Sequence, residues 1–246
     1  MSSSMDQIKF ETILIEPSKV TVKGVDYPSS LANIGEVIKK ALLNISPVPC
    51  RVIIDDFIAP SYLIEPVNDL PTDTESRLAF FNWRYEQLST SKDRKKVVAN
   101  TLNEKGWILT GMSTKLIEDI DECLTTLGFS VLSISPRWSS IANQLFASCE
   151  EVPSCLVCLS PTRQDCYRGS LLGWHDSINL FRQWSEDSNL QALTQERIYP
   201  TLAFLERIWG QKPKLYTYGS PESWRINDYS PILLNKNIYT GAMHVS

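Results

Sequence analysis

The sequence has little of what several functional classes require. Its 246 residues contain no apolar run of the roughly 18 to 20 residues that cross a bilayer, and its first residues lack the basic and apolar regions of a signal peptide. The 24 basic residues do not outnumber the 28 acidic ones, so no positive field attracts nucleic acid or an anionic membrane. We therefore expect a cytoplasmic protein that binds no nucleic acid and does not itself insert into a membrane.

Histidine, the residue most often used for acid–base catalysis, is scarce as well. The only two histidines are His175 and His244. His175-Asp176-Ser177 cannot form a catalytic triad, because three consecutive side chains do not converge in the required relay. Asp176 instead predicts the start of a helix that ends near Trp184. A P-loop motif is also absent, so neither general histidine chemistry nor P-loop phosphate binding is supported.

Six irregularly spaced cysteines indicate reduced thiols and not a disulfide framework. Cys155 and Cys158 form a CxxC pattern, with Cys149 and Cys166 nearby, which suggests a zinc or redox site. The pattern falls in a predicted strand, however, where residues three apart point to opposite faces. Buried small apolar side chains are the favoured interpretation.

The chain does contain a regular alternation of β-rich and amphipathic helical segments, and its 43% hydrophobic content can bury a large core. The predicted strands span residues 8–16, 19–25, 51–58, 61–66, 95–101, 106–112, 129–134, 154–160, 164–169, 170–174 and 215–218. The predicted helices span residues 31–44, 75–88, 113–127, 136–148, 176–184 and, with a break at Pro200, 188–209. The segment past Asn235 is expected to be loose.

Two segments resemble one another at a distance of about 144 residues. Residues 13–20, followed by Gly24, and residues 157–164, followed by Gly169, each read as a strand, a Pro-Ser or Pro-Thr turn and a second strand. This period is too long for a solenoid and favours a duplicated lobe. The change of character near residues 150–153 predicts a first lobe over 1–150, with an inserted subdomain at about 51–112, and a reduced second lobe over 151–246.

Residues 51–145 resemble the PilM/GspL-type proteins of type IV pilus and type II secretion systems, within the actin-like superfamily. The resemblance is carried by Val52-Ile53-Ile54-Asp55-Asp56, Tyr62-Leu63-Ile64-Glu65-Pro66, Phe80-Phe81-Asn82-Trp83-Arg84-Tyr85-Glu86, Gly106-Trp107-Ile108-Leu109-Thr110-Gly111, Gly128-Phe129-Ser130-Val131, Ser135-Pro136 and Asn143. It implies an α/β, actin-like (RNase H-like) fold of two duplicated lobes, with mixed sheets flanked by helices.

The resemblance also implies a function. PilM-like proteins are scaffolds of an inner-membrane assembly platform, and a groove of the first lobe receives the cytoplasmic N-terminus of a PilN-like membrane partner. An assembly ATPase is a further candidate partner. The transmembrane helix of GspL-type proteins is not found in this sequence, which favours the PilM-like role at the inner membrane. An exposed strand edge or an apolar cleft near residues 8–25 would support such binding.

Actin-like enzymes hold phosphates with glycine-containing hairpin turns, because closely approaching backbone N–H groups surround the anion. Here the matching turns are Glu16-Pro17-Ser18 and Ser160-Pro161-Thr162, in which proline offers no N–H. Asp165 is predicted to lie along a strand and not at the tip. We therefore expect a pseudo-ATPase, and we assign no catalytic, cofactor-binding or metal-binding residue.

Four alternatives remain open. Asp55-Asp56, at the end of a hydrophobic strand, could bind a metal, but adjacent strand residues point to opposite faces and a polar strand end is favoured. Tryptophans on predicted helices could be interface anchors or core residues: Trp83, Trp138, Trp184 and Trp209. The whole protein could also be an active actin-like or sugar-kinase-like enzyme with an unorthodox nucleotide site, or a subunit of an unrelated complex.

Overall fold

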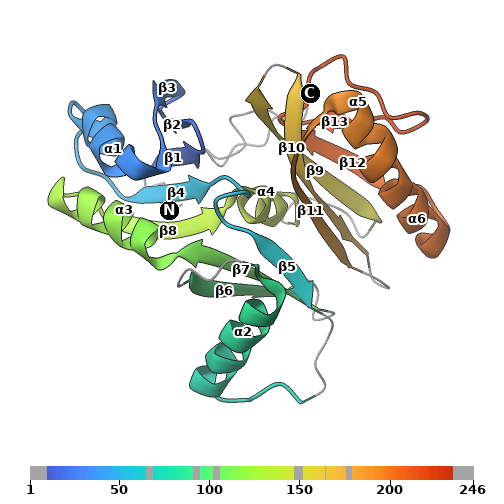
Figure 1. Ribbon diagram of the computed structural model, residues 1–246, viewed down its shortest axis with the longest axis horizontal. Coiled ribbons are helices and arrows are strands. Elements are labelled where there is room, and N and C mark those ends of the chain that lie inside the picture. The colour runs from blue at the N-terminus through green and yellow to red at the C-terminus, as the bar shows by residue number, and fades with distance from the viewer. Residues whose placement is uncertain are drawn as a thin grey trace, which may run out of the picture.

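The computed structural model describes residues 10–64, 69–90, 95–101, 106–146, 152–163, 165–175 and 179–234. These residues form an α/β structure in which three sheets are flanked by helices (Figure 1). No helix in these ranges is long and apolar enough to span a membrane.

The first five-stranded sheet, sheet A, has the order β3-β2-β1-β4-β8. β1, β2 and β3 are antiparallel neighbours, whereas β1, β4 and β8 run parallel. Side chains alternate between its faces, as expected for strands. The strands are β1 (Glu11–Glu16), β2 (Lys19–Val22), β3 (Val25–Pro28), β4 (Cys50–Ile54) and β8 (Val131–Pro136).

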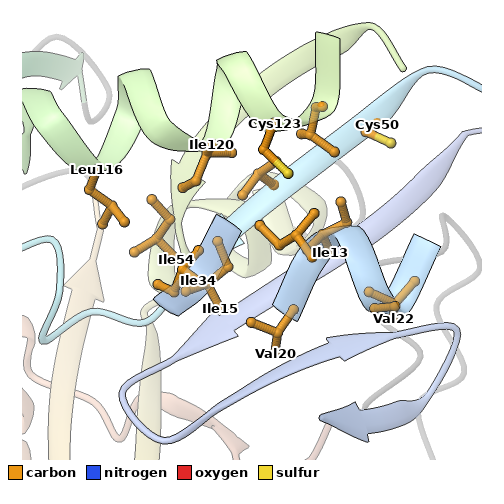
Figure 2. Close-up of a cluster of buried hydrophobic side chains, with 14 of the residues drawn as sticks. Ile13, Ile15, Val20, Val22, Ile34, Cys50, Ile54, Leu116, Ile120 and Cys123 are labelled. Carbon is orange, nitrogen blue, oxygen red and sulfur yellow. The ribbon is translucent and has the colours of Figure 1, made fainter. Parts of the chain in front are cut away.

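Two helices cover one face of sheet A: α1 (Ile34–Leu42), which follows the short 3-10 turn η1 (Leu31–Asn33), and α3 (Thr114–Thr126). Ser113 caps α3 by accepting a hydrogen bond from the Leu116 N–H. Figure 2 shows side chains of both helices packed on those of the sheet, among them Ile13 and Ile120. This cluster is the apolar core of the sheet.

Sheet B has three antiparallel strands in the order β5-β7-β6. They are β5 (Ser61–Ile64), β6 (Lys95–Thr101) and β7 (Trp107–Ser113), and α2 (Thr74–Leu88) packs on them. Phe81 and Tyr85 are the buried residues of α2, and the Tyr85 ring fits only because residue 111 is glycine.

Sheet C repeats the design of sheet A, with the order β11-β10-β9-β12-β13. β11, β10 and β9 are antiparallel neighbours, whereas β12 runs parallel to β9 and β13 runs parallel to β12. Sheet A has the same pattern of directions. The predicted duplication is therefore confirmed by the repeated sheet order. The strands are β9 (Ser154–Arg163), β10 (Cys166–Trp174), β11 (Leu180–Asn189), β12 (Lys214–Tyr218) and β13 (Ile232–Leu233).

The outer face of sheet C is covered by one helical run, made of α5 (Leu190–Leu193), the π-helical turn η2 (Thr194–Ile198) and α6 (Tyr199–Trp209). Pro200 lies in the first turn of α6, where its missing N–H is tolerated. On the opposite face, α4 (Arg137–Phe146) packs between sheets A and C.

Two sequence predictions are wrong in this region. The helix predicted from Asp176 to Trp184 is wrong, because residues 180–184 belong to strand β11 and pair with β10, as do Ser188 and Asn189. Asp176 and Ser177 lie outside the described residues. The two strands predicted at 164–169 and 170–174 are one strand, β10. In both places long-range pairing overrides local preference. The boundary predicted near residue 150 falls within 147–151, which the structure does not describe, so the division into 1–150 and 151–246 stays a prediction.

Candidate functional site between the five-stranded sheets

A buried guanidinium joins the two hairpins of the duplicated fold. Arg137, the first residue of α4, has a side chain that is 1% exposed. Its Nη2 lies 2.6 Å from Asp55 Oδ2 and 3.0 Å from Glu16 Oε1, and its Nη1 donates to Ser160 Oγ at 2.8 Å. Glu16 ends β1 and Ser160 lies in β9, so one side chain connects sheets A and C.

Asp55 is held in place from both sides. Its backbone N–H donates to the Ile15 carbonyl at 2.8 Å, which continues the pairing of β4 with β1 past the end of the strand. Its Oδ1 accepts from the Phe57 N–H at 2.9 Å, and its Oδ2 accepts from Ser160 Oγ at 2.9 Å. The carboxylate is fully buried, and each of its oxygens has a donor.

Asp56 makes a second connection to sheet C. Its Oδ1 accepts from the Trp138 N–H at 3.0 Å and its Oδ2 from Ser170 Oγ at 2.8 Å. Burial raises the pKa of Asp56 to about 6, against the lowering effect of Arg137 and with a further raising effect of Asp55. We call Glu16, Asp55, Asp56, Arg137, Ser160 and Ser170 the intersheet cluster.

Further hydrogen bonds extend this cluster to sheet B. Gln183 of β11 donates to the Asp56 carbonyl oxygen and accepts from the Ser61 N–H at 3.0 Å. Ser61 Oγ accepts from the Trp138 indole N–H at 3.1 Å and lies 2.8 Å from the Thr110 hydroxyl oxygen. Buried polar contacts therefore hold all three sheets in one arrangement.

The cluster connects parts of the protein to one another. Arg137 supplies one positive charge beside three carboxyl groups, those of Glu16, Asp55 and Asp56, and its guanidinium also lies 5.6 Å from the centre of the Tyr218 ring. Among the described residues, no group of three or more histidine, cysteine, aspartate or glutamate side chains is arranged to hold a metal ion.

The two hairpin turns differ from each other. In the first, Pro17 and Ser18 form the turn between β1 and β2, as predicted. In the second, the predicted turn at Ser160-Pro161-Thr162 is wrong, because these residues lie within β9, whereas Asp165, with a φ of +54°, lies in the turn. Pro161 is tolerated there because β12 pairs with β9 only up to Cys158. Gln164 lies outside the described residues.

The expectation that Asp55 and Asp56 point to opposite faces is also wrong. The pair follows the end of β4 in a turn, where strand alternation no longer applies, and both carboxylates bond to hydroxyls of sheet C. The two residues do form a polar strand end, as favoured, and this end is buried.

Alternation does hold for the cysteines. Cys155 packs in the core under α6 and Cys158 in the core beside α4, on opposite faces of β9. Both thiols are buried, which raises their pKa well above the ordinary value. Cys149 lies outside the described residues and Cys166 is half-buried.

The tryptophans divide between core and surface. Trp138 and Trp209 are buried, Trp184 is partly buried on β11, and Trp83 of α2 is 53% exposed. The His175 ring packs against Trp209 with centroids 5.8 Å apart, and His244 lies outside the described residues.

Sequence reasoning missed Arg137, Ser170 and Gln183. The only local signal is an arginine that follows Ser135-Pro136 at the start of an apolar helix, where a buried charge requires partners. Those partners are distant in the sequence, so they became visible only in the fold.

The arrangement of two five-stranded sheets of the same order, each beginning with a hairpin, is similar to solved structures of the actin-like ATPase fold. A Bacteroides thetaiotaomicron protein of that fold and of unknown function aligns over 87% of this chain and 83% of its own, with a TM-score of 0.54 and 10% identity.

More particularly, the chain resembles the structure of the PilM-PilN type IV pilus biogenesis complex, with a TM-score of 0.55, 14% identity, and 85% and 80% of the two chains covered. The cytoplasmic domain of EpsL, an inner-membrane component of the Vibrio cholerae type II secretion system, aligns at a TM-score of 0.49, 12% identity, and 94% and 92% coverage. No family model and no curated protein sequence matches. At these identities the similarity establishes the fold alone. The actin-like fold that the sequence predicted is thereby confirmed.

Proposed function

We propose that this protein is a non-catalytic scaffold of a pilus- or secretion-type assembly platform, held at the inner membrane through a PilN-like partner. The observation that carries the non-catalytic part is Arg137, whose guanidinium occupies the space between the two hairpin strands β1 and β9. In the actin-like fold, the hairpins at this place hold the phosphates of the nucleotide. The pilus and secretion part is supported by the structural similarity to PilM.

Electrostatics adds to the proposal. Glu16 and Asp55 lie beside the same guanidinium, and Asp56 is next to them. A polyphosphate placed there would meet these carboxylates and would have to displace Arg137 from a bond of 2.6 Å to Asp55. Pro17 in the first turn has no N–H to offer the anion.

Nucleotide titration tests the non-catalytic part. We expect millimolar magnesium-ATP or ADP to leave the melting temperature unchanged relative to magnesium with inorganic phosphate at equal ionic strength. A nucleotide at about 100 times its Kd would add about 2.7 kcal/mol, or roughly 5 to 11 °C for a chain of this size. A rise of that order would instead favour the active-enzyme alternative.

For the partner, we propose that the peptide binds along the outer edge of β8. Among the described strands β8 pairs only with β4, so its other edge can accept an added strand. Figure 1 shows β8 on the side of sheet A that faces β7 and β6. Leu132 of β8 is 51% exposed, which gives an extended peptide an apolar contact. The opposite edge, β3, satisfies the expectation of an exposed edge near residues 8–25 and serves as the comparison.

A labelled peptide of the N-terminal cytoplasmic segment of a PilN-like protein, encoded near this gene, tests the site by fluorescence anisotropy. We expect Leu132→Asp on β8 to weaken binding at least tenfold and Val25→Asp on β3, where Val25 is 52% exposed, to leave it unchanged. The reverse result would move the site to β3. Absence of binding to the unmodified protein would refute the proposed partner. The conclusion on nucleotide binding would be unaffected, because it depends on the separate titration.

A further inference from the structure

Helix α6 carries an apolar ridge on its outer side. Phe204 and Ile208 lie one turn apart and are 39% and 40% exposed, and Pro200 is exposed one turn earlier. Residues four apart share one face of a helix, so the three lie in line. Leu202 and Leu205 of the same helix point into the core under sheet C.

The duplication provides an internal comparison. α1 follows the third strand of sheet A, as the helical run ending in α6 follows the third strand of sheet C. The exposed positions of α1 include the charged residues Glu36, Lys39 and Lys40. The equivalent helix therefore meets solvent with charged side chains, so the position of α6 in the repeat does not require an apolar outer side.

Three exposed arginines surround the ridge. Arg182 of β11 donates from Nη1 to Thr201 Oγ1 at 3.2 Å on one flank of α6, Arg207 precedes Ile208, and Arg197 precedes Pro200 by one turn. No carboxylate in the described part of the chain forms an ion pair with any of the three.

Two carboxylates lie close to the ridge in sequence. Glu206 is turned to the Tyr229 hydroxyl, 2.6 Å away, and Glu196 is exposed beside Arg197. The net charge around the ridge is therefore positive, in a chain whose overall charge is −4.

We propose that this surface, the α6 ridge, binds an acidic amphipathic segment of a second partner protein. The apolar side of such a segment would cover Phe204 and Ile208, and its carboxylates would pair with the arginines. A second copy of this chain would bring arginines against arginines. An anionic bilayer is disfavoured by the overall negative charge and by ridge side chains that are more than half covered. Figure 1 shows α6 far from β8, so the two surfaces are separate.

Site-specific photocrosslinking in the cells that make this protein tests the proposal. Phe204→p-benzoyl-phenylalanine in the full chain should give adducts, mapped by mass spectrometry, to a segment in which apolar residues alternate with Asp or Glu. The same substitution at Lys40 of α1 is the matched control and should not label that segment. Adducts to lipid, to a second copy or to a basic segment, or the absence of adducts, would overturn the proposal.

Charge reversal supplies the second arm. Arg197→Glu with Arg207→Glu should lower the yield of the acidic adduct at least tenfold, whereas Lys39→Glu with Lys40→Glu should leave it unchanged. All four positions are exposed, and an unchanged melting temperature verifies folding. If a reversed variant unfolds, Arg197→Gln with Arg207→Gln replaces it and should lower the yield at least threefold. An adduct that persists in the folded arginine variants would refute the role of charge.

Discussion

Replacing Arg137 by methionine should be among the most destabilising single changes in this chain. Methionine keeps a similar stem but leaves the buried carboxylate of Asp55 without its cation, and it removes the donors to Glu16 and Ser160. Removing one partner of a buried ion pair typically costs about 3 to 5 kcal/mol. For a chain of this length, this corresponds to a fall in melting temperature of about 6 to 20 °C.

Urea unfolding followed by far-UV circular dichroism measures this loss. Asp55→Asn added to Arg137→Met removes the uncompensated charge, so the double variant should regain part of the loss. Arg137→Lys, which keeps the charge but lacks the planar fork, should fall between the wild type and the methionine variant. A loss below about 1 kcal/mol for Arg137→Met would be the value of a solvated surface pair, and it would refute the view that the cluster fastens the sheets.

Two further predictions concern single positions. The pKa of Asp56 is raised from 3.8 to about 6, so the ionised carboxylate disfavours the folded state and the contribution of Asp56 to stability falls as pH rises from about 4 to 6. Asp56→Asn should therefore stabilise the protein by up to about 3 kcal/mol above pH 6. This gain should disappear near pH 4, as measured by urea unfolding at a series of pH values. Gly219 has a φ of +75°, and a Cβ there would lie 2.1 Å from the Leu159 carbonyl oxygen, so Gly219→Ala should cost at least about 2 kcal/mol in thermal unfolding. A Cβ at Gly35 in α1 would meet nothing within 4 Å. Gly35→Ala should therefore be neutral or stabilise the protein by up to about 1 kcal/mol. The first prediction is contradicted if the free energies of unfolding of the wild type and Asp56→Asn differ by the same amount at every pH. The second is contradicted if the two glycine variants have equal effects on stability.

Local signals were sufficient for most of the fold. The Ser113 cap and the inward-facing Leu116, Ile120 and Leu124 define α3 because the cap and the apolar face agree in one short segment. α2 is predicted less completely: its range of 75–88 agrees with Thr74–Leu88, but Asp73 caps it and only Phe81 and Tyr85 of its apolar residues are buried. Where capping and periodicity coincide, tertiary contacts only confirm what the segment already prefers.

Strand β11 shows where local signals fail. Leu180 and Trp184 are four residues apart, which suits a helix, and the residues between them, Phe-Arg-Gln, do not alternate between apolar and polar as a half-buried strand would. The strand forms because β10 offers it a ladder of hydrogen bonds. The internal repeat did not supply the missing information either, because the counterpart β3 was not predicted: residues 19–25 were predicted as one strand, whereas the structure has β2 and β3 there.

The intersheet cluster lay further beyond reach. Glu16, Arg137 and Ser160 are more than a hundred residues apart at the extremes, and only the packing of α4 between the sheets brings them together. A single arginine in an apolar helix indicates that a partner exists, not which one. Among the carboxylates of the chain, the selection of Asp55 depends on the backbone bond that fixes its position beside β1.

The structure also changes the reason for expecting no nucleotide. The sequence pointed to a proline in each hairpin turn, but Pro161 lies inside β9 and only Pro17 stands at a turn. The missing N–H therefore explains one hairpin and not the other. At the second hairpin the relevant group is the hydroxyl of Ser160, which accepts from Arg137 and donates to Asp55. In the scaffold that we propose, the reason for expecting no nucleotide is therefore the occupation of this space by Arg137 and its carboxylate partners, which lies against both hairpins at once.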